Sequence, residues 1–97
     1  MTEMTGSAPK VTRAPGVLLR RLMDERKIGP ATLALRAGMQ LPVLRQVLDG
    51  TARVDQVTAG RLGTALGTGT QFWLDCQAGY DADIARGAKD VSEENDD

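Results

Sequence analysis

Apolar residues recur at helical spacing along the middle of the chain, and the strict alternation of apolar and polar residues that marks half-buried strands is absent. This period predicts amphipathic α-helices, each with one apolar face. The predicted helices are Pro15–Lys27, Pro30–Ala37, Pro42–Asp49, Gln56–Leu66 and Gln71–Ala85. The pattern therefore indicates an all-α fold of five helices.

Prolines and glycines mark the ends of these predicted helices. Pro15, Pro30 and Pro42 each suit the first helical position, where a missing N–H breaks no hydrogen bond. The residue before each proline then becomes the cap, and these caps are Ala14, Gly29 and Leu41. Asp55 is expected to cap the fourth helix with its side chain. The glycines expected to end helices are Gly38, Gly50 and Gly67.

Two glycines, Gly60 and Gly63, lie inside the fourth predicted helix. Each costs the helix up to about 1 kcal/mol relative to alanine. We expect close packing of another backbone segment against this helix to be the reason for both.

The chain has 97 residues, which fits one small domain, and its single cysteine, Cys76, has no partner for an internal disulfide. No secretion signal or membrane-spanning run is visible, so a cytoplasmic protein is expected. Without histidine, His/Cys zinc sites and Ser-His or Cys-His catalysis are excluded. No paired carboxylates or phosphate-binding glycine loop appear either. We therefore expect no enzyme activity, cofactor or metal.

The net charge of −1 conceals an uneven distribution. Residues 15–80 hold eight basic against five acidic residues, a net of +3, whereas residues 81–97 carry −5. The middle is therefore mildly basic, as in a nucleic-acid binder. Residues 1–14 are predicted to be a flexible arm and residues 87–97 a disordered acidic tail. The tail is interpreted either as a solubilising end or as a competitor of DNA for the basic surface.

The segment from residue 30 to residue 49 carries the functional signal. Ala34 is a small residue midway along the first of two short helices, and Gly38 lies in the turn between them. Two helices that cross steeply need a small residue at their contact and a residue that tolerates positive φ between them. The pattern resembles a helix-turn-helix, whose second helix enters the major groove of DNA. A plain helical hairpin is the alternative.

Two further segments resemble the HigA antitoxins of the XRE helix-turn-helix family. APGVLLRRLMDERKI is similar to the opening of that family, and LGTGTQFWLDCQAGYD is similar to its closing signature. The matching positions of the signature are Leu66, Gly67, Phe72, Trp73, Leu74, Gln77, Tyr80 and Asp81. The resemblance covers about residues 14–82. It implies a compact five-helix lambda-repressor-like domain that dimerises, represses its own promoter and neutralises a HigB toxin, an mRNA-cleaving ribonuclease related to RelE.

On this interpretation, residues 15–67 form the DNA-binding domain and the helix within residues 68–86 forms the dimer. In the helix from Pro42, Gln46 points outward and can pair with an adenine edge, while flanking Arg45 can reach guanine or phosphate. The predicted DNA-binding residues are Arg36, Gln40, Leu41, Val43, Arg45, Gln46 and Arg53. Arg36 and Arg53 are expected to contact phosphate, and Leu41 or Val43 a thymine methyl group.

The last helix has more aromatic and apolar residues than one core-facing side requires. Its predicted dimer-interface residues are Phe72, Trp73, Leu74, Cys76, Gln77 and Tyr80. The alternative is that these residues close the core of the single chain. A dimer would read two half-sites of a palindromic operator about 34 Å apart.

Some residues depart from the family's pattern. Pro30 stands where many members have a glutamine, and Leu41 and Pro42 replace polar residues at the start of the recognition helix. Asp49 adds a negative charge near the expected DNA backbone. Two alternatives to the antitoxin therefore stay open. One is a stand-alone XRE-type repressor, and the other is a toxin-binding module with weakened DNA binding.

Overall fold

The computed structural model describes residues 11–87 and 89–90. Over these residues the chain forms five helices and two very short strands. In chain order they are β1 (Val11–Thr12), α1 (Pro15–Arg26), α2 (Pro30–Ala37), α3 (Leu41–Asp49), α4 (Gln56–Leu66), α5 (Thr70–Ala85) and β2 (Lys89–Asp90). The predicted five-helix fold is confirmed.

The helix ends follow local backbone chemistry. α2 and α4 have the predicted bounds, and Asp55 caps α4 by accepting a 2.8 Å hydrogen bond from the Thr58 N–H. This bond lowers the pKa of Asp55. α1 ends one residue earlier than predicted, because Lys27 adopts the left-handed conformation at φ 57°. α3 begins one residue earlier, because Gln40 and not Leu41 takes the extended cap conformation.

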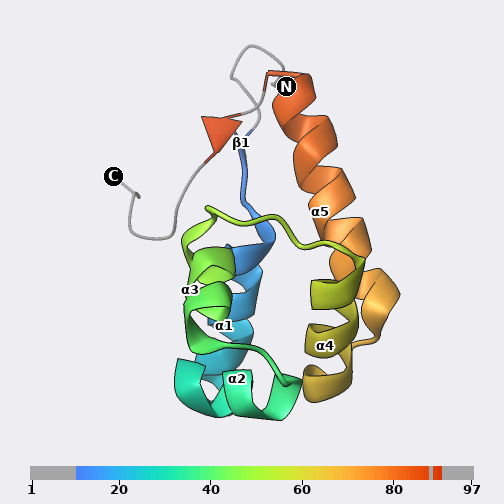
Figure 1. Ribbon diagram of the computed structural model, residues 1–97. Helices are drawn as coiled ribbons and strands as arrows, with labels where there is room; N and C mark the ends of the chain where they lie inside the picture. Colours follow the sequence, from blue (N-terminus) through green and yellow to red (C-terminus); the bar gives the residue numbers. More distant parts are fainter. Residues whose placement is uncertain (1–10, 88, 91–97) are drawn as a thin grey trace.

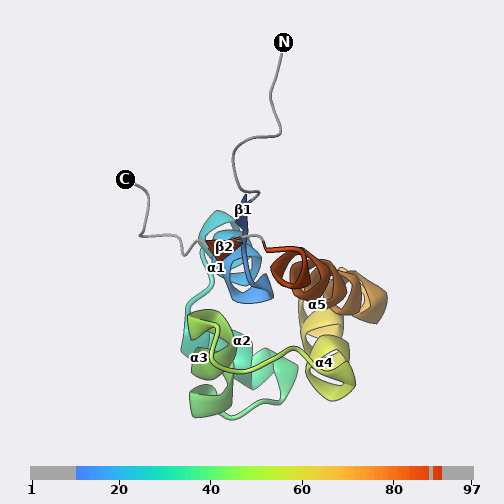
Figure 2. The same cartoon turned by 90° about the horizontal axis from the view of Figure 1, so that it is seen from above.

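The five helices pack against one another around a small core. α4 and α5 run antiparallel against each other, α3 packs on α1, and α2 crosses below α3 and α4 (Figure 1). Seen from above, α2, α3 and α4 lie on one side of the molecule, with α1, α5 and the strands behind them (Figure 2). Among the described residues, no helix has the length and apolar character needed to span a bilayer.

Every helix contributes one large, fully buried side chain to the core. These residues are Leu19 from α1, Leu33 from α2, Leu44 from α3, Leu62 from α4 and Trp73 from α5. The Trp73 indole N–H donates a 2.7 Å hydrogen bond to the Thr68 hydroxyl, so this buried polar group is satisfied. Removing any one of these side chains would therefore open a cavity shared by several helices.

Two glycines allow backbone segments to approach each other. A Cβ added to Gly16 in α1 would lie 2.8 Å from the Leu48 carbonyl oxygen and closer still to that of Val47. A Cβ on Gly63 in α4 would lie 2.5 Å from the Gly69 carbonyl oxygen. The expectation of close backbone packing therefore holds for Gly63. It does not hold for Gly60, whose added Cβ would have its nearest neighbour at 3.8 Å, an ordinary contact.

The two strands lie within the segments that the sequence predicted to be a flexible arm and a disordered tail. Val11 pairs with Lys89 and Thr12 with Asp90 in parallel register, beside the carboxyl-terminal turns of α5 (Figure 1). Strands of two residues leave no periodic signal in a sequence, which explains why the pattern missed them. The remainder of the predicted arm and tail, residues 1–10, 88 and 91–97, lies outside the described residues.

We predict opposite effects of alanine at the two glycines of α4. Gly63→Ala should lower the free energy of unfolding by about 1–3 kcal/mol, because the methyl group must displace backbone. Gly60→Ala should raise it by up to about 1 kcal/mol, because the site has room and alanine favours helix. Urea denaturation of both variants measures the difference. Equal effects would contradict the packing described for Gly63.

Candidate nucleic-acid interface

α2 and α3 cross through a turn that three elements hold in place. Gly38 ends α2 at φ 68°, and the Met39 N–H donates to the Ala34 carbonyl. Arg61 on α4 donates to the Gly38 carbonyl at 3.0 Å and lies within 3.5 Å of the Ala37 carbonyl. The guanidinium thus satisfies carbonyls that the end of α2 leaves without helical partners. This contact ties the turn between α2 and α3 to α4.

α3 divides cleanly into an inner and an outer face. Leu44, Val47 and Leu48 are buried in the core. The exposed side chains of this helix are Pro42, Val43, Arg45, Gln46 and Asp49. No part of the described chain covers the outer face, so the side predicted to meet DNA is open to solvent.

The predicted DNA-binding residues do not all lie together. Gln40, Val43, Arg45 and Gln46 are exposed on α3 or at its cap, and Arg45 has no ion-pair partner among the described residues. Leu41 is half-buried against the core, which reduces what it can offer to a base.

Arg36 lies apart, on the last turn of α2, where it lines a depression between α2 and α4 together with Arg61.

The charge around α3 is more favourable for binding DNA than Asp49 alone suggests. Asp49 lies 3.9 Å from Arg20 of α1, so its charge is partly compensated.

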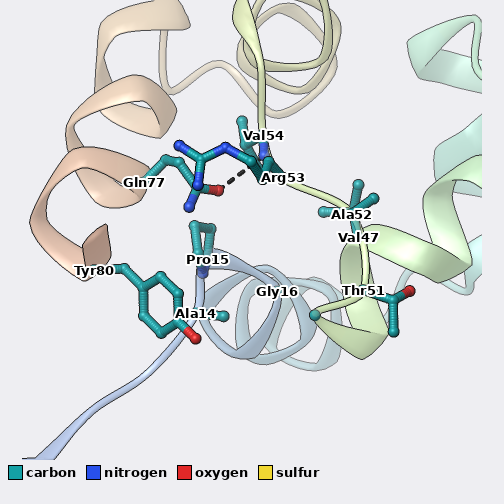
Figure 3. A pocket seen from close by; sticks show the side chains of 11 residues that line it. Ala14, Pro15, Gly16, Val47, Thr51, Ala52, Arg53, Val54, Gln77 and Tyr80 are labelled. Atoms are coloured by element: carbon teal, nitrogen blue, oxygen red, sulfur yellow. Dashed lines mark hydrogen bonds between the residues drawn. The ribbon is translucent and has the colours of Figure 1, made fainter. Parts of the chain in front are cut away.

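Arg53 is held by α5. Its two terminal nitrogens donate to the Asp81 carboxylate, Nη1 to Oδ1 at 3.0 Å and Nη2 to Oδ2 at 2.5 Å. Gln77 lies between them and the core: its Oε1 accepts from the buried Val54 N–H at 2.8 Å, and its Nε2 donates to Asp81 at 3.0 Å. Figure 3 shows Gln77 reaching the Val54 backbone with Arg53 beside it. These bonds tie the α3–α4 loop to α5.

This network perturbs both charged groups. The hydrogen bond from Arg53 lowers the pKa of Asp81, and the same carboxylate raises the pKa of Arg53. Neither Asp81 nor the role of Gln77 was predicted, although both belong to the closing signature. The spacing of Gln77 and Asp81 could have indicated a shared role, because residues four apart lie on the same face of a helix. Trp73, four residues before Gln77, shows that this face begins in the core.

The predicted dimer-interface residues also separate into two groups. Trp73 is fully buried and Gln77 is 6% exposed, so both side chains are used inside the single chain. This differs from the expectation that they face a second copy. Phe72 remains 38% exposed, and Leu74, Cys76 and Tyr80 are half-buried. Burial raises the pKa of the Cys76 thiol, and neighbouring Asp75 adds to the effect.

The structure also bears on metal binding. Within residues 11–87 and 89–90, no three His, Cys, Asp or Glu side chains are grouped as metal ligands. The polar residues described above cap helices, bind loop residues or lie exposed on α3.

No protein-family model and no curated protein matches the chain by sequence. Several solved structures are similar to its fold. Antitoxin HigA of Pseudomonas aeruginosa, solved with the higBA promoter, is 30% identical with a TM-score of 0.69 over 73% of this chain and 78% of that one. An addiction module antidote protein of the HigA family from Coxiella burnetii is 30% identical, with a TM-score of 0.68 over 74% and 79%. The antitoxin GraA is 30% identical, with a TM-score of 0.71 over 84% and 85%.

The tight α2–α3 crossing and the uncovered outer face of α3 define a helix-turn-helix domain, the class whose second helix enters a DNA groove. The similarity to the Coxiella and Pseudomonas antitoxins identifies the family within this class. The chain belongs to the HigA family of antitoxins.

We predict that Gln77 is essential for the stability of the loop after α3. Gln77→Leu removes the acceptor of the buried Val54 N–H, which should lower the free energy of unfolding by about 1–3 kcal/mol. Gln71→Leu is the matched control, because Gln71 is exposed on the same helix and bonds only to Asp75 in the hydrogen bonds described. That variant should change stability by less than about 0.5 kcal/mol. Urea denaturation measures both variants. Similar losses of unfolding free energy would argue against the proposed role of the Gln77–Val54 hydrogen bond.

Proposed function

We propose that this protein is a dimeric antitoxin of a type II toxin–antitoxin system, which binds its own operator and neutralises a HigB-type mRNA-cleaving ribonuclease. The observation that carries the DNA-binding part is the open outer face of α3, where Arg45 and Gln46 are adjacent and exposed. A Pseudomonas aeruginosa protein 30% identical to this chain was solved in complex with 18 base pairs of its operator DNA. A protein that binds its own operator would act in the cytoplasm.

In this proposal, each helix-turn-helix reads one half of a palindrome. Gln46 pairs with an adenine edge, and Arg45 binds guanine or phosphate. Arg53 contacts phosphate from the loop that follows α3. The remaining proposed contacts are Arg36, Gln40, Leu41 and Val43. Residues 15–67 would form the DNA-binding unit, and the helix within residues 68–86 the dimer seam.

The proposed operator binding requires a dimer, because one α3 contacts only a few base pairs. The proposed seam is the side of α5 that carries exposed Phe72 and half-buried Cys76 and Tyr80. Half-buried Leu74 lies on the other side of the helix, toward Asp81. Two copies paired at the proposed seam would present two α3 helices, and half-sites about 34 Å apart would match successive turns of one groove.

Arg45→Ala tests the DNA-binding proposal. If Arg45 reads guanine, the variant should bind the upstream DNA about 1–3 kcal/mol more weakly, and discrimination at one base should relax. If Arg45 holds a phosphate, the loss should be uniform across sequences, with a shallower salt dependence. Fluorescence anisotropy titrations at two salt concentrations measure both quantities.

The matched control for this test is Arg86→Ala, which removes the same charge at the carboxyl end of α5. It should leave affinity nearly unchanged. Unchanged affinity in Arg45→Ala would remove Arg45 from the interface.

The toxin-binding proposal predicts a separable activity. Purified protein should suppress RNA cleavage by the basic product of the neighbouring reading frame and co-purify with it. Arg45→Ala should retain this suppression, because it alters a side chain that points to DNA. Suppression without salt-sensitive binding to upstream DNA would instead identify the toxin-binding module that Pro30, Leu41 and Pro42 suggest. DNA binding with no toxin suppression would identify a stand-alone repressor.

A further inference from the structure

The brace between α5 and the α3–α4 loop engages two consecutive residues. Val54 is bound through its backbone N–H and Arg53 through two N–H groups of its guanidinium, and all three bonds end on one turn of α5. We propose that Asp81 is a positioning residue for DNA binding, which holds the Arg53 guanidinium in place for a DNA phosphate. This inference rests on the proposed operator binding and adds a residue that does not itself touch DNA.

Arg53 can keep Asp81 and still bind phosphate. A guanidinium has five N–H donors, and the pair with Asp81 uses one on each terminal nitrogen. The Nε–H and one N–H on each Nη remain. The Arg53 side chain stays 68% exposed while paired, so these donors are accessible to a ligand.

The carboxylate is itself held in place, unlike that of an ordinary surface pair. An exposed Arg–Asp pair usually contributes little, because two mobile side chains must be ordered to form it. Here Gln77 orders Asp81 by donating to Oδ1, and Gln77 is fixed by the buried Val54 N–H. The ordering cost is therefore largely met by the fold before DNA arrives, which is the physical basis of preorganisation.

Loss of the carboxylate has a predictable consequence. In Asp81→Asn the Arg53 charge stays, but its bidentate partner is replaced by a neutral amide that can accept through one oxygen. The guanidinium then becomes mobile and must be ordered by DNA. Long-range attraction to DNA increases while the short-range contact weakens, so affinity and salt dependence report different parts of the change.

The test is a double-mutant cycle on operator affinity. Wild type, Asp81→Asn, Arg53→Ala and the double variant are titrated with the upstream DNA at two salt concentrations. Asp81→Asn should weaken binding about tenfold, within the range for neighbours in one ion-pair network. In the Arg53→Ala background the same change should have no further effect, because Asp81 acts through Arg53.

Two further variants make the cycle specific. Asp24→Asn makes the same acid-to-amide change at an exposed site on α1 and should leave affinity nearly unchanged. Arg53→Lys retains the charge at an exposed position but cannot form the two-nitrogen pair. It should also bind about tenfold more weakly.

Several outcomes would overturn the inference. Equal or tighter binding by Asp81→Asn would show that Asp81 competes with DNA or plays no part. An equal loss in the Arg53→Ala background would show a purely structural role, and full affinity in Arg53→Lys would show that the pair geometry is unimportant. Absence of binding by wild type would overturn operator binding together with this inference. Wild-type binding with an unaffected Asp81→Asn variant would overturn this inference alone.

Discussion

The arrangement depends on the direct contact between the backbones of α1 and α3 at Gly16. Because Gly16 has no side chain, the last turn of α3 rests on α1 itself, with the Val47 and Leu48 carbonyls where a Cβ would be. α3 is thereby supported from behind, and Leu44 completes the attachment at its middle. No residue on the outer face is needed to hold the helix. That face is consequently free to carry Arg45 and Gln46, whose chemistry suits DNA edges and not a core.

Much of the fold was predictable because its signals are local. Proline marked the starts of three helices and glycine the ends of three to within a residue, and the outward direction of Gln46 on α3 followed from the period of that helix alone. The braces were not predictable, because Arg53 and Asp81 are 28 residues apart and Arg61 and Gly38 are 23 apart. A period within one helix carries no information about such contacts. The assignment of Gln77 to a dimer interface differs from the structure for the same reason, since its partner is a backbone N–H in a distant loop.

The departures at the start of α3 have a structural interpretation. Leu41 is the first residue of the helix and packs partly on the core, while Pro42 follows with no N–H to donate. The first two residues of α3, a region that offers polar groups to DNA in many helix-turn-helix proteins, are therefore apolar here. Under the proposed operator binding, base recognition would move toward the middle of the helix, where Arg45 and Gln46 lie. This shift implies a different operator sequence and does not require loss of DNA binding.

Two faces of α5 have different roles. One face carries Gln77 and Asp81, which hold the loop after α3, and another carries the exposed Phe72 and the half-buried Cys76 and Tyr80. A second copy bound to the exposed face would restrain the helix that restrains the DNA-binding loop. Dimerisation would then do more than place two α3 helices at a fixed distance, because it would also stiffen the position of Arg53 in each copy. If α5 is the dimer seam and Arg53 contacts DNA, pairing and DNA contact would be coupled through a single helix, without any movement of α3 relative to the core.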